Sequence, residues 1–280
     1  MSTAIARRPG RLRVVLRDVG ASAALVYLAL LLVAALAAPW IAPYDPVRLN
    51  LGAVLLPPSA EHWAGTDDLG RDVLSRLLHG AGPSLFSSLA AVTMAALIGV
   101  PFGLAAGFFG GWLDAAISRV IDALLSFPTI LLAVGIAAVL GTSLTNAVIA
   151  IGIAFAPGFA RLMRATTMAV KQELYVDAAR AIGASPAWLL LRHVLPNAVT
   201  PVIVNAGLLL GTALLAEASL SFLGLGVQPP QASWGGMLAR ALIYMERAPE
   251  LMYAPGLALL LTALAFNSLG ETARRLLDPR

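Results

Sequence analysis

The chain has 280 residues, of which 59% are apolar and only 12% are charged. A soluble globule of this length needs more polar side chains to cover its surface, so the composition excludes that class and indicates a protein whose solvent is lipid. The net charge of +4 does not indicate nucleic-acid binding, because the chain has a single lysine, Lys171, and its dispersed arginines form no basic stripe.

The first apolar run, from about Val19 to Ala42, follows an arginine-rich arm at residues 1–18. A membrane span needs about 20 apolar residues, whereas the core of a secretory signal has about 7–15. Residues 19–42 are therefore predicted to form the first transmembrane helix, preceded by a cytoplasmic arm. A cleaved signal peptide is the alternative, because Ala35, Ala37 and Ala38 resemble a cleavage site.

A polar segment, 43–83, follows and is predicted to lie outside the cytoplasm. It contains side chains of the types that bind metals: His62, Asp67, Asp68, Asp72 and His79. Their spacing is not that of convergent ligands, so no metal site is predicted. Instead, Asp67–Asp72 is expected to cap a short amphipathic helix, Val73–Leu78, along the outer surface, where Trp63 and Trp234 suit the membrane interface.

Five more spans are predicted from stretches without charges, because a charge at mid-bilayer costs about 2.5–3.5 kcal/mol. They are Leu85–Phe109, two spans within the 38 residues between Asp122 and Arg161, Ala198–Leu223 and Leu251–Leu269. The turn Gly141–Asn146 divides the middle pair. The fold is thus predicted to be all-α, a polytopic membrane protein with six transmembrane helices, five of which form a core over 84–270.

The basic residues fall on one side of this topology. The arm, the Phe109–Arg119 turn, the segment 161–197 and the tail 271–280 hold 14 of the 19 arginines and lysines, so these parts and both termini are predicted to be cytoplasmic. Pro43–Pro83 and Gly226–Glu250 hold the other five beside several acids. Those two segments are predicted to face outward.

Glycines mark one face of the second predicted span. Gly99, Gly103 and Gly107 recur every four residues, and Pro101 is expected to kink the helix. Small residues allow transmembrane helices to approach closely, so the face is interpreted as a packing contact within the chain. A pore-lining role is the alternative.

The segment 170–197, between the fourth and fifth spans, is predicted to be a hairpin of two short helices. The first helix carries an apolar stripe at helical spacing, made of Leu174, Ala178, Ala181 and Ile182. One interpretation is a helix lying on anionic lipid headgroups. The small Ala178 and Ala179, together with the acids Glu173 and Asp177, favour instead the groove of a partner protein.

The residues between the two predicted helices are typical of a helix end followed by a helix start. Gly183 is suited to the left-handed conformation that ends a helix. Ser185-Pro186 supply an N-cap and a first-turn proline for the second helix, which is expected to stop before Pro196. Two helices at a fixed angle are the predicted result.

These residues resemble the signature loop of the inner-membrane permeases of binding-protein-dependent ATP-binding-cassette (ABC) importers. That loop reads E-A-A, three residues, Gly, nine residues, Ile, one residue, Leu-Pro. This chain has Asp177-Ala178-Ala179, Gly183, His193 and Leu195-Pro196 at the same spacing. Asp177 and His193 are departures, since the family has Glu and Ile there.

The resemblance extends along nearly the whole chain and is to the second permease of the dipeptide/oligopeptide/nickel branch. The similar segments are Gly65–Gly80, Glu217–Pro230, Ser233–Leu238 and Leu269–Arg280. Ala81-Gly82-Pro83 departs from the family, where members often place an arginine. The resemblance implies an inner-membrane transport subunit for peptides rather than an enzyme, with nickel or another small solute as the alternative cargo.

By this resemblance the hairpin is a coupling element that docks in a cleft of a cytoplasmic ATPase. The residues expected at that contact are Glu173, Tyr175, Asp177, Ala178, Ala179, Gly183, Ala184, Ser185, Leu195 and Pro196. The implied partners are a second permease, two ATP-binding subunits or one fused ATPase, and an extracytoplasmic substrate-binding protein that the outer helix Val73–Leu78 helps to receive. ATP and Mg²⁺ are expected on the ATPase, because this chain has no G-x-x-x-x-G-K-[ST] motif.

Glu217 is the only acid well inside a predicted span, which makes it a functional-site candidate. With Ser221 it is assigned to the translocation path, where its charge would meet the ammonium group of a peptide. The alternative is a structural role near the outer end of the fifth span, paired with the loop Gln228–Trp234.

Two other function classes stay open at this point. An ion-coupled secondary transporter normally needs more than one buried carboxylate. An intramembrane enzyme would need H-E-x-x-H, G-x-S-x-G or a cysteine nucleophile, and the sequence contains none of these. The cargo also stays open among peptides, glutathione-like thiols and nickel chelates.

Overall fold

The computed structural model describes residues 19–277, so the N-terminal arm and residues 278–280 of the tail lie outside the described residues. Within the described range the chain is helical and contains no β-strand, which confirms the all-α prediction. Five helices are long and apolar enough to cross a membrane. They are α2 (Val19–Ile41), α3 (Val73–Phe109), α6 (Leu144–Lys171), α10 (Thr200–Phe222) and α12 (Tyr253–Leu277).

Shorter helices connect and cover these five. They are α4 (Gly111–Leu125), α5 (Thr129–Leu140), α7 (Leu174–Ala181), α8 (Pro186–Leu189), α9 (Leu195–Ala198) and α11 (Trp234–Ile243). A π-helical turn, η1 (Leu190–Val194), joins α8 to α9, and a 3-10 turn, η2 (Pro249–Met252), precedes α12. Helix α3 packs against both α6 and α10, and α12 lies between α10 and α2.

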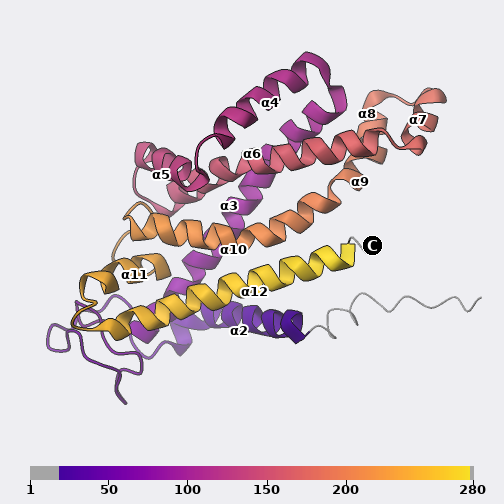
Figure 1. The fold of residues 1–280 in the computed structure, drawn as a ribbon. Coiled ribbons are helices and arrows are strands. Elements are labelled where there is room, and N and C mark those ends of the chain that lie inside the picture. The colour runs from indigo at the N-terminus through magenta and orange to yellow at the C-terminus, as the bar shows by residue number, and fades with distance from the viewer. Residues whose placement is uncertain (1–18, 278–280) are drawn as a thin grey trace, which may run out of the picture.

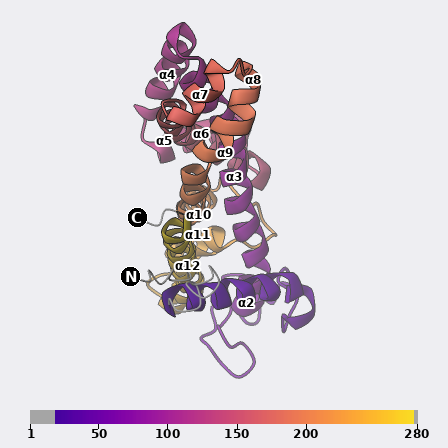
Figure 2. The same cartoon turned by 90° about the vertical axis from the view of Figure 1, so that its right-hand side faces the viewer.

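The two ends of the bundle differ (Figure 1). Helices α7 and α8 lie at the same end as the start of α2 and the end of α12, whereas α11 and the segment before α3 lie at the opposite end. Figure 2 shows α2 at one edge of the molecule and α4 at the other. The described ends of the first and last spanning helices therefore share a side, as an even number of crossings requires.

The second span differs from its prediction, because α3 begins at Val73 rather than near Leu85. The expected outer helix, Val73–Leu78, is the first part of a single helix of 37 residues, about 55 Å long. Pro83 lies inside it, although proline removes a backbone donor. This part of α3 packs against α11 around Trp234, and the helix continues through Pro83 without a break.

The third span is broken rather than continuous. Helices α4 and α5 meet at an angle of 90°, and the break contains Pro128. Helix α5 has 12 residues, about 18 Å, which is too short to cross a hydrocarbon core of about 30 Å. The chain therefore has six crossings if the bent pair counts as one. The predicted turn at Gly141–Asn146 is confirmed, since Ser143 caps the start of α6.

The glycine face of α3 packs inside the chain, as interpreted from the sequence. A Cβ on Gly103 would overlap the Ala160 carbonyl oxygen of α6 and lie 2.9 Å from the Met163 Cβ. Gly99 and Gly107 meet α6 in the same way. The main core therefore lies between α3 and α6, where glycines, which have no Cβ, allow the two backbones to approach closely.

Candidate functional site

The predicted helical hairpin is present between α6 and α10. Helix α7 is its first arm, and α8, η1 and α9 form the second arm. In Figure 1 the arms stand at the end of the molecule where α6 finishes. Because α10 begins at Thr200, directly after α9, the second arm continues into a spanning helix.

The turn between the arms has the predicted geometry. Gly183 has a φ of +88°, the left-handed conformation that a glycine adopts without strain. The backbone N–H of Ala184 donates to the Ala179 carbonyl at 3.1 Å, and that of Gly183 donates to Arg180 at 3.0 Å. These two bonds define a Schellman end. The Ser185 hydroxyl then caps α8 by accepting from the Trp188 N–H at 3.3 Å.

The apolar stripe of α7 is not covered by the chain. Leu174 is 85% exposed and Ile182 is 87% exposed, and Ala178 and Ala181 between them are exposed as well. The buried face of the helix is instead made by Val176 and Ala179. A helical pattern shows that a face is apolar but not whether the same chain covers it. We call the four residues Leu174, Ala178, Ala181 and Ile182 the exposed stripe.

The buried side of the hairpin is fixed to the inner end of α3. Val176, Leu189 and Val194 form a cluster with Phe108, the penultimate residue of α3. Lys171, at the end of α6, donates to the Phe108 carbonyl oxygen, and its ammonium group lies 5.7 Å from the ring centre. The hairpin is therefore held against two spanning helices as well as being continuous with α10.

The second arm does not stop before Pro196, which corrects the prediction. The arm widens into the π turn η1, where the Leu195 N–H donates to the Leu190 carbonyl, and Pro196 lies inside α9. In a regular α-helix the proline ring would meet the carbonyl four residues earlier, and the wider turn relieves this contact. The Asn197 side chain donates to the His193 carbonyl at 2.6 Å. The helical path from hairpin to membrane is thereby maintained.

His193, which departs from the family pattern, joins the two arms. Its ring lies 4.6 Å from the Trp188 ring and 5.9 Å from the Tyr175 ring, measured between centroids. Tyr175 belongs to α7 and Trp188 to α8, so the imidazole bridges the two arms. A flat ring can replace the aliphatic side chain of the family at this position.

The ten residues assigned to the ATPase contact do not all lie at the surface. Seven are exposed: Glu173, Tyr175, Asp177, Ala178, Gly183, Ser185 and Pro196. Ala179 is buried inside the hairpin, and Ala184 and Leu195 are half-buried. The sequence did not single out two exposed apolar side chains of the second arm, Trp188 and Leu191. The sequence could have indicated them, because they are apolar residues beyond those, Leu189 and Val194, that form the buried face of this arm.

Glu217 and Ser221 lie inside the subunit, near the C-terminal end of α10. Glu217 has 0% exposure, and the Ser221 hydroxyl donates to its Oε1 at 2.7 Å. The same hydroxyl accepts from the Val227 N–H at 3.2 Å, so the pair contacts the loop that follows α10. This contact agrees with the structural alternative. A place on the translocation path stays a prediction.

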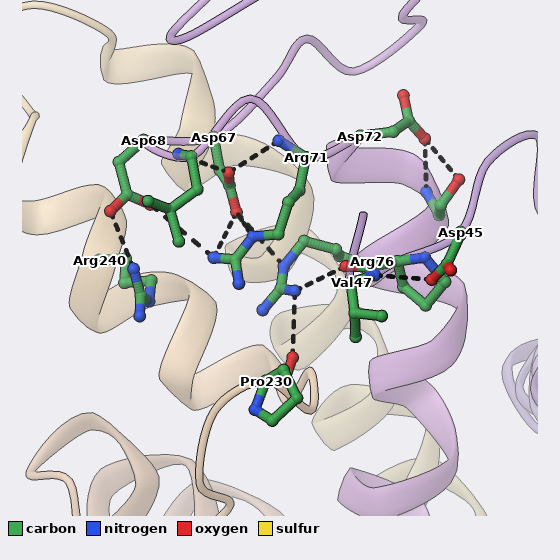
Figure 3. Close-up of polar contacts among 12 residues, drawn as sticks. Asp45, Val47, Asp67, Asp68, Arg71, Asp72, Arg76, Pro230 and Arg240 are labelled. Carbon is green, nitrogen blue, oxygen red and sulfur yellow. Dashed lines mark hydrogen bonds and ion pairs between the residues drawn. The ribbon is translucent and has the colours of Figure 1, made fainter. Parts of the chain in front are cut away.

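The charged side chains of the outer segment form ion pairs with one another (Figure 3). Asp67 lies 2.7 Å from the Arg71 guanidinium and 3.4 Å from that of Arg76, and Asp68 lies 2.8 Å from Arg240 of α11. Among residues 19–277, no three His, Asp or Glu side chains are grouped so that they could hold a metal ion. The acids that resemble metal ligands therefore hold the segment together.

Arg76 joins three separate parts of the outer end. Beyond Asp67, its Nη1 donates to the Pro46 carbonyl at 2.8 Å and to the Pro230 carbonyl at 3.4 Å (Figure 3). Asp72 caps α3 through the Ser75 N–H and also lies 2.9 Å from His62. We call this group of ion-paired and hydrogen-bonded side chains the outer network: Asp67, Asp68, Arg71, Asp72, Arg76, Arg240 and His62.

Comparison with known proteins gives two family matches. Residues 99–280 match the family model for the binding-protein-dependent transport system inner membrane component. Residues 12–58 match the model for the N-terminal transmembrane domain of oligopeptide transport permease C. The two matches together cover the first span, the hairpin and the chain from the last part of α3 onward, whereas residues 59–98 lie between them.

Individual relatives agree with these models. The chain is 46% identical over 266 residues to the glutathione transport system permease protein GsiD of Escherichia coli O6:K15:H31 and of Shigella boydii serotype 4, covering 93% of this chain and 86% of each relative. Its fold is similar to a chain of the inward-facing MetNI methionine ABC transporter, with a TM-score of 0.61 and 19% identity over 72% of this chain and 96% of that chain. The structural match supports the fold alone.

Proposed function

The chain belongs to the family of binding-protein-dependent transport system inner membrane components, and we propose that it helps an ABC importer to carry short peptides, of about the size of glutathione, into the cell. It is a multi-pass inner-membrane transport subunit and not an enzyme. The named cargo of its relatives supports a peptide-like substrate. Nickel or another small solute is the second candidate, and the family favours ATP-driven transport over the ion-coupled alternative.

The observation that carries the proposal is the exposed stripe on α7. An apolar helix face with 85% and 87% exposure at its two ends needs a partner surface, and an amphipathic helix typically docks in a groove. The proposed partner is a cytoplasmic ATPase, which binds ATP and Mg²⁺. The small side chains of Ala178 and Ala181 allow the backbone of that partner to come close.

The attachment of the hairpin explains how force reaches the membrane. The hairpin packs on Phe108 of α3 and is continuous with α10, so displacement of the hairpin moves the inner ends of both helices. Movement of these helices against those of the second permease would expose a shared site to alternate sides of the membrane. The hairpin is thus proposed to act as a lever.

The remaining partners follow from the orientation. The arginine bias and the shared side of the described helix ends support cytoplasmic termini beside the hairpin. The outer network then faces the opposite compartment, where a substrate-binding protein would deliver the cargo. The translocation path is proposed to lie between this chain and a second permease.

The test is reconstitution of the chain with the second permease, ATPases and binding protein encoded beside it. We expect ATP-dependent uptake of a labelled tripeptide such as glutathione into proteoliposomes, stimulated by the binding protein. A nickel chelate serves as the competing cargo. Uptake that persists without ATP, or an ATPase that never associates with the chain, would contradict the proposal.

A further inference from the structure

The outer end of α10 contains a buried polar cluster that the coupling hairpin does not use. The carboxyl of Glu217 has no accessible surface, and its Oε1 accepts from the Ser221 hydroxyl at 2.7 Å. Ser221 in turn accepts from the Val227 backbone N–H at 3.2 Å. Because Val227 belongs to the loop 223–233, the cluster ties this extracytoplasmic loop to the last turns of a spanning helix.

The loop and the start of α11 also lie directly on α10. A Cβ on Gly226 would lie 2.9 Å from the Ser221 Cα, and a Cβ on Gly235 would lie 2.6 Å from the Ala218 Cα. No side chain larger than hydrogen fits at either position without displacement. The loop therefore has little freedom to move independently of the outer end of α10.

Helix α3 contacts both this loop and the start of α11. The Trp234 indole N–H donates to the Leu77 carbonyl at 3.0 Å, and Arg76 donates to the Pro230 carbonyl at 3.4 Å. The loop thus bridges α3 and α10. A shift of one helix against the other must be absorbed at this bridge.

One contact at this bridge is incomplete. Glu217 Oε2 and the Ser84 hydroxyl of α3 are both buried, and neither has a hydrogen-bond partner. The Ser84 hydroxyl nevertheless lies beside the Glu217 carboxyl, at the margin of hydrogen-bonding distance. Unpaired buried polar groups are costly, so a conformation in which α10 moves slightly towards Ser84 gains a hydrogen bond between the two helices.

We propose that Glu217 is a positioning residue that transmits movement of α10 to the extracytoplasmic loop 223–233. The inference rests on the proposed function, because α10 is the helix that continues from the coupling hairpin. At 23 residues α10 is a rod about 35 Å long, so displacement of its inner end is felt at its outer end. Glu217 and Ser221 carry the loop with the helix, and Ser84 is the contact that forms or breaks as α10 moves.

The experiment uses the absence of cysteine from the chain. Gln231, an exposed residue of the loop, is replaced by cysteine as the only thiol of this subunit in the assembled transporter. The rate at which a thiol reagent labels it is measured without nucleotide and after addition of ATP and vanadate, which traps the ADP formed by hydrolysis on the ATPase. The variants are Glu217→Ala, Glu217→Gln and Ser221→Ala, with Ser219→Ala as the control because Ser219 is an exposed residue of the same turns.

We expect the nucleotide trapped by vanadate to change the labelling rate of the wild type and the Ser219→Ala control equally. Glu217→Ala and Ser221→Ala should reduce this change by about fivefold, the scale of one lost hydrogen bond. Co-purification of the ATPase with these variants should persist, which a misfolded subunit would not allow. Glu217→Gln should retain the change, because an amide of the same shape accepts from Ser221 and can donate to Ser84.

Three results would overturn the inference. The first is an ATP-dependent change that is the same in Glu217→Ala, Ser221→Ala and wild type. The second is a wild-type loop that does not respond although ATP is hydrolysed. The third is a Glu217→Gln variant that moves its loop normally but loses transport, since this would assign Glu217 to recognition of a cationic cargo. Failure of the ATPase to associate would instead overturn the proposed function.

Discussion

Gly183 occupies the one position of the hairpin turn where backbone conformation dictates the residue. Its φ of +88° lies in the left-handed region, and no atom lies within 4 Å of the place where a Cβ would stand. The glycine is therefore required by its dihedral angle and not by lack of space. The sequence predicts this from position alone, since Gly183 separates an apolar helix from a Ser-Pro start.

Replacing Gly183 by valine should abolish transport while the protein still inserts into the membrane. A left-handed residue with a side chain costs about 1–2 kcal/mol, and a branched one costs more, so the angle between the arms changes. Asparagine tolerates this conformation, and Gly183→Asn should retain most uptake. Uptake and the amount of inserted protein are measured together. Normal uptake by Gly183→Val would remove the turn from the coupling mechanism.

Replacing Ile182 by aspartate should release the ATPase without unfolding the subunit. Ile182 is 87% exposed, so the folded chain gains no buried charge. Burial of an isoleucine side chain at an interface is worth about 1.5–3 kcal/mol, so co-purification of the ATPase should weaken by at least about tenfold. Ile243→Asp, on an exposed isoleucine at the opposite end of the molecule, is the matched control. Equal ATPase binding in both variants would argue against docking on the exposed stripe.

At the scale of elements, the sequence predicts which segments are helices better than where they end. Apolar length identifies α2, α6, α10 and α12, but Gly82-Pro83 misleads because packing around Trp234 keeps α3 helical from Val73. The opposite error occurs at Pro128, where an apolar interval long enough for a span contains a 90° bend. Proline signals a break in both places, and tertiary contacts decide whether it happens.

The contact between α3 and α6 should be sensitive to a single methyl group. Gly103→Ala would overlap the Ala160 carbonyl oxygen, and such overpacking costs about 1–3 kcal/mol. Gly82→Ala, in the same helix, meets no atom within 4 Å and should not destabilise the subunit. The melting temperature of the purified subunit in detergent, followed by size-exclusion chromatography, distinguishes the two. Equal melting temperatures would mean that the helices separate easily at this point.

At the scale of the whole molecule, the outer network could not be predicted from the sequence. Asp68 and Arg240 are 172 positions apart, and Arg76 and Pro230 are 154 apart. Local patterns contain no information on such pairs, so the sequence indicates these acids only as possible metal ligands or helix caps. The exposure of the stripe on α7 could not be predicted for a related reason. Periodicity identifies the apolar face, but the surface proposed to cover it belongs to another chain. The candidate site is thus predictable where spacing defines it and not where distant segments meet.

The outer network should hold the segment before α3 in place, and Arg76 is the residue whose loss tests this. Arg76→Ala removes the guanidinium that contacts Asp67 and the carbonyl oxygens of Pro46 and Pro230. Arg71 still pairs with Asp67, so the main loss is that of the hydrogen bonds from Arg76 to the two carbonyl oxygens, and leaving such buried acceptors without this donor costs about 1–3 kcal/mol each. The segment 43–65 should then detach locally while the spanning helices remain assembled.

Protease added to intact spheroplasts provides the measurement, because it reaches only the outer face of the membrane. We expect faster cleavage within residues 43–65 of Arg76→Ala than of the wild type. Arg48→Ala, which changes an exposed arginine of the same segment, should be cleaved at the wild-type rate. Cleavage that requires access from the cytoplasm would reverse the orientation inferred from the arginines. A cleavage rate of Arg76→Ala equal to that of Arg48→Ala would mean that other contacts, such as the hydrogen bond from the Tyr44 N–H to the Ser75 hydroxyl of α3, and not charge, hold the segment.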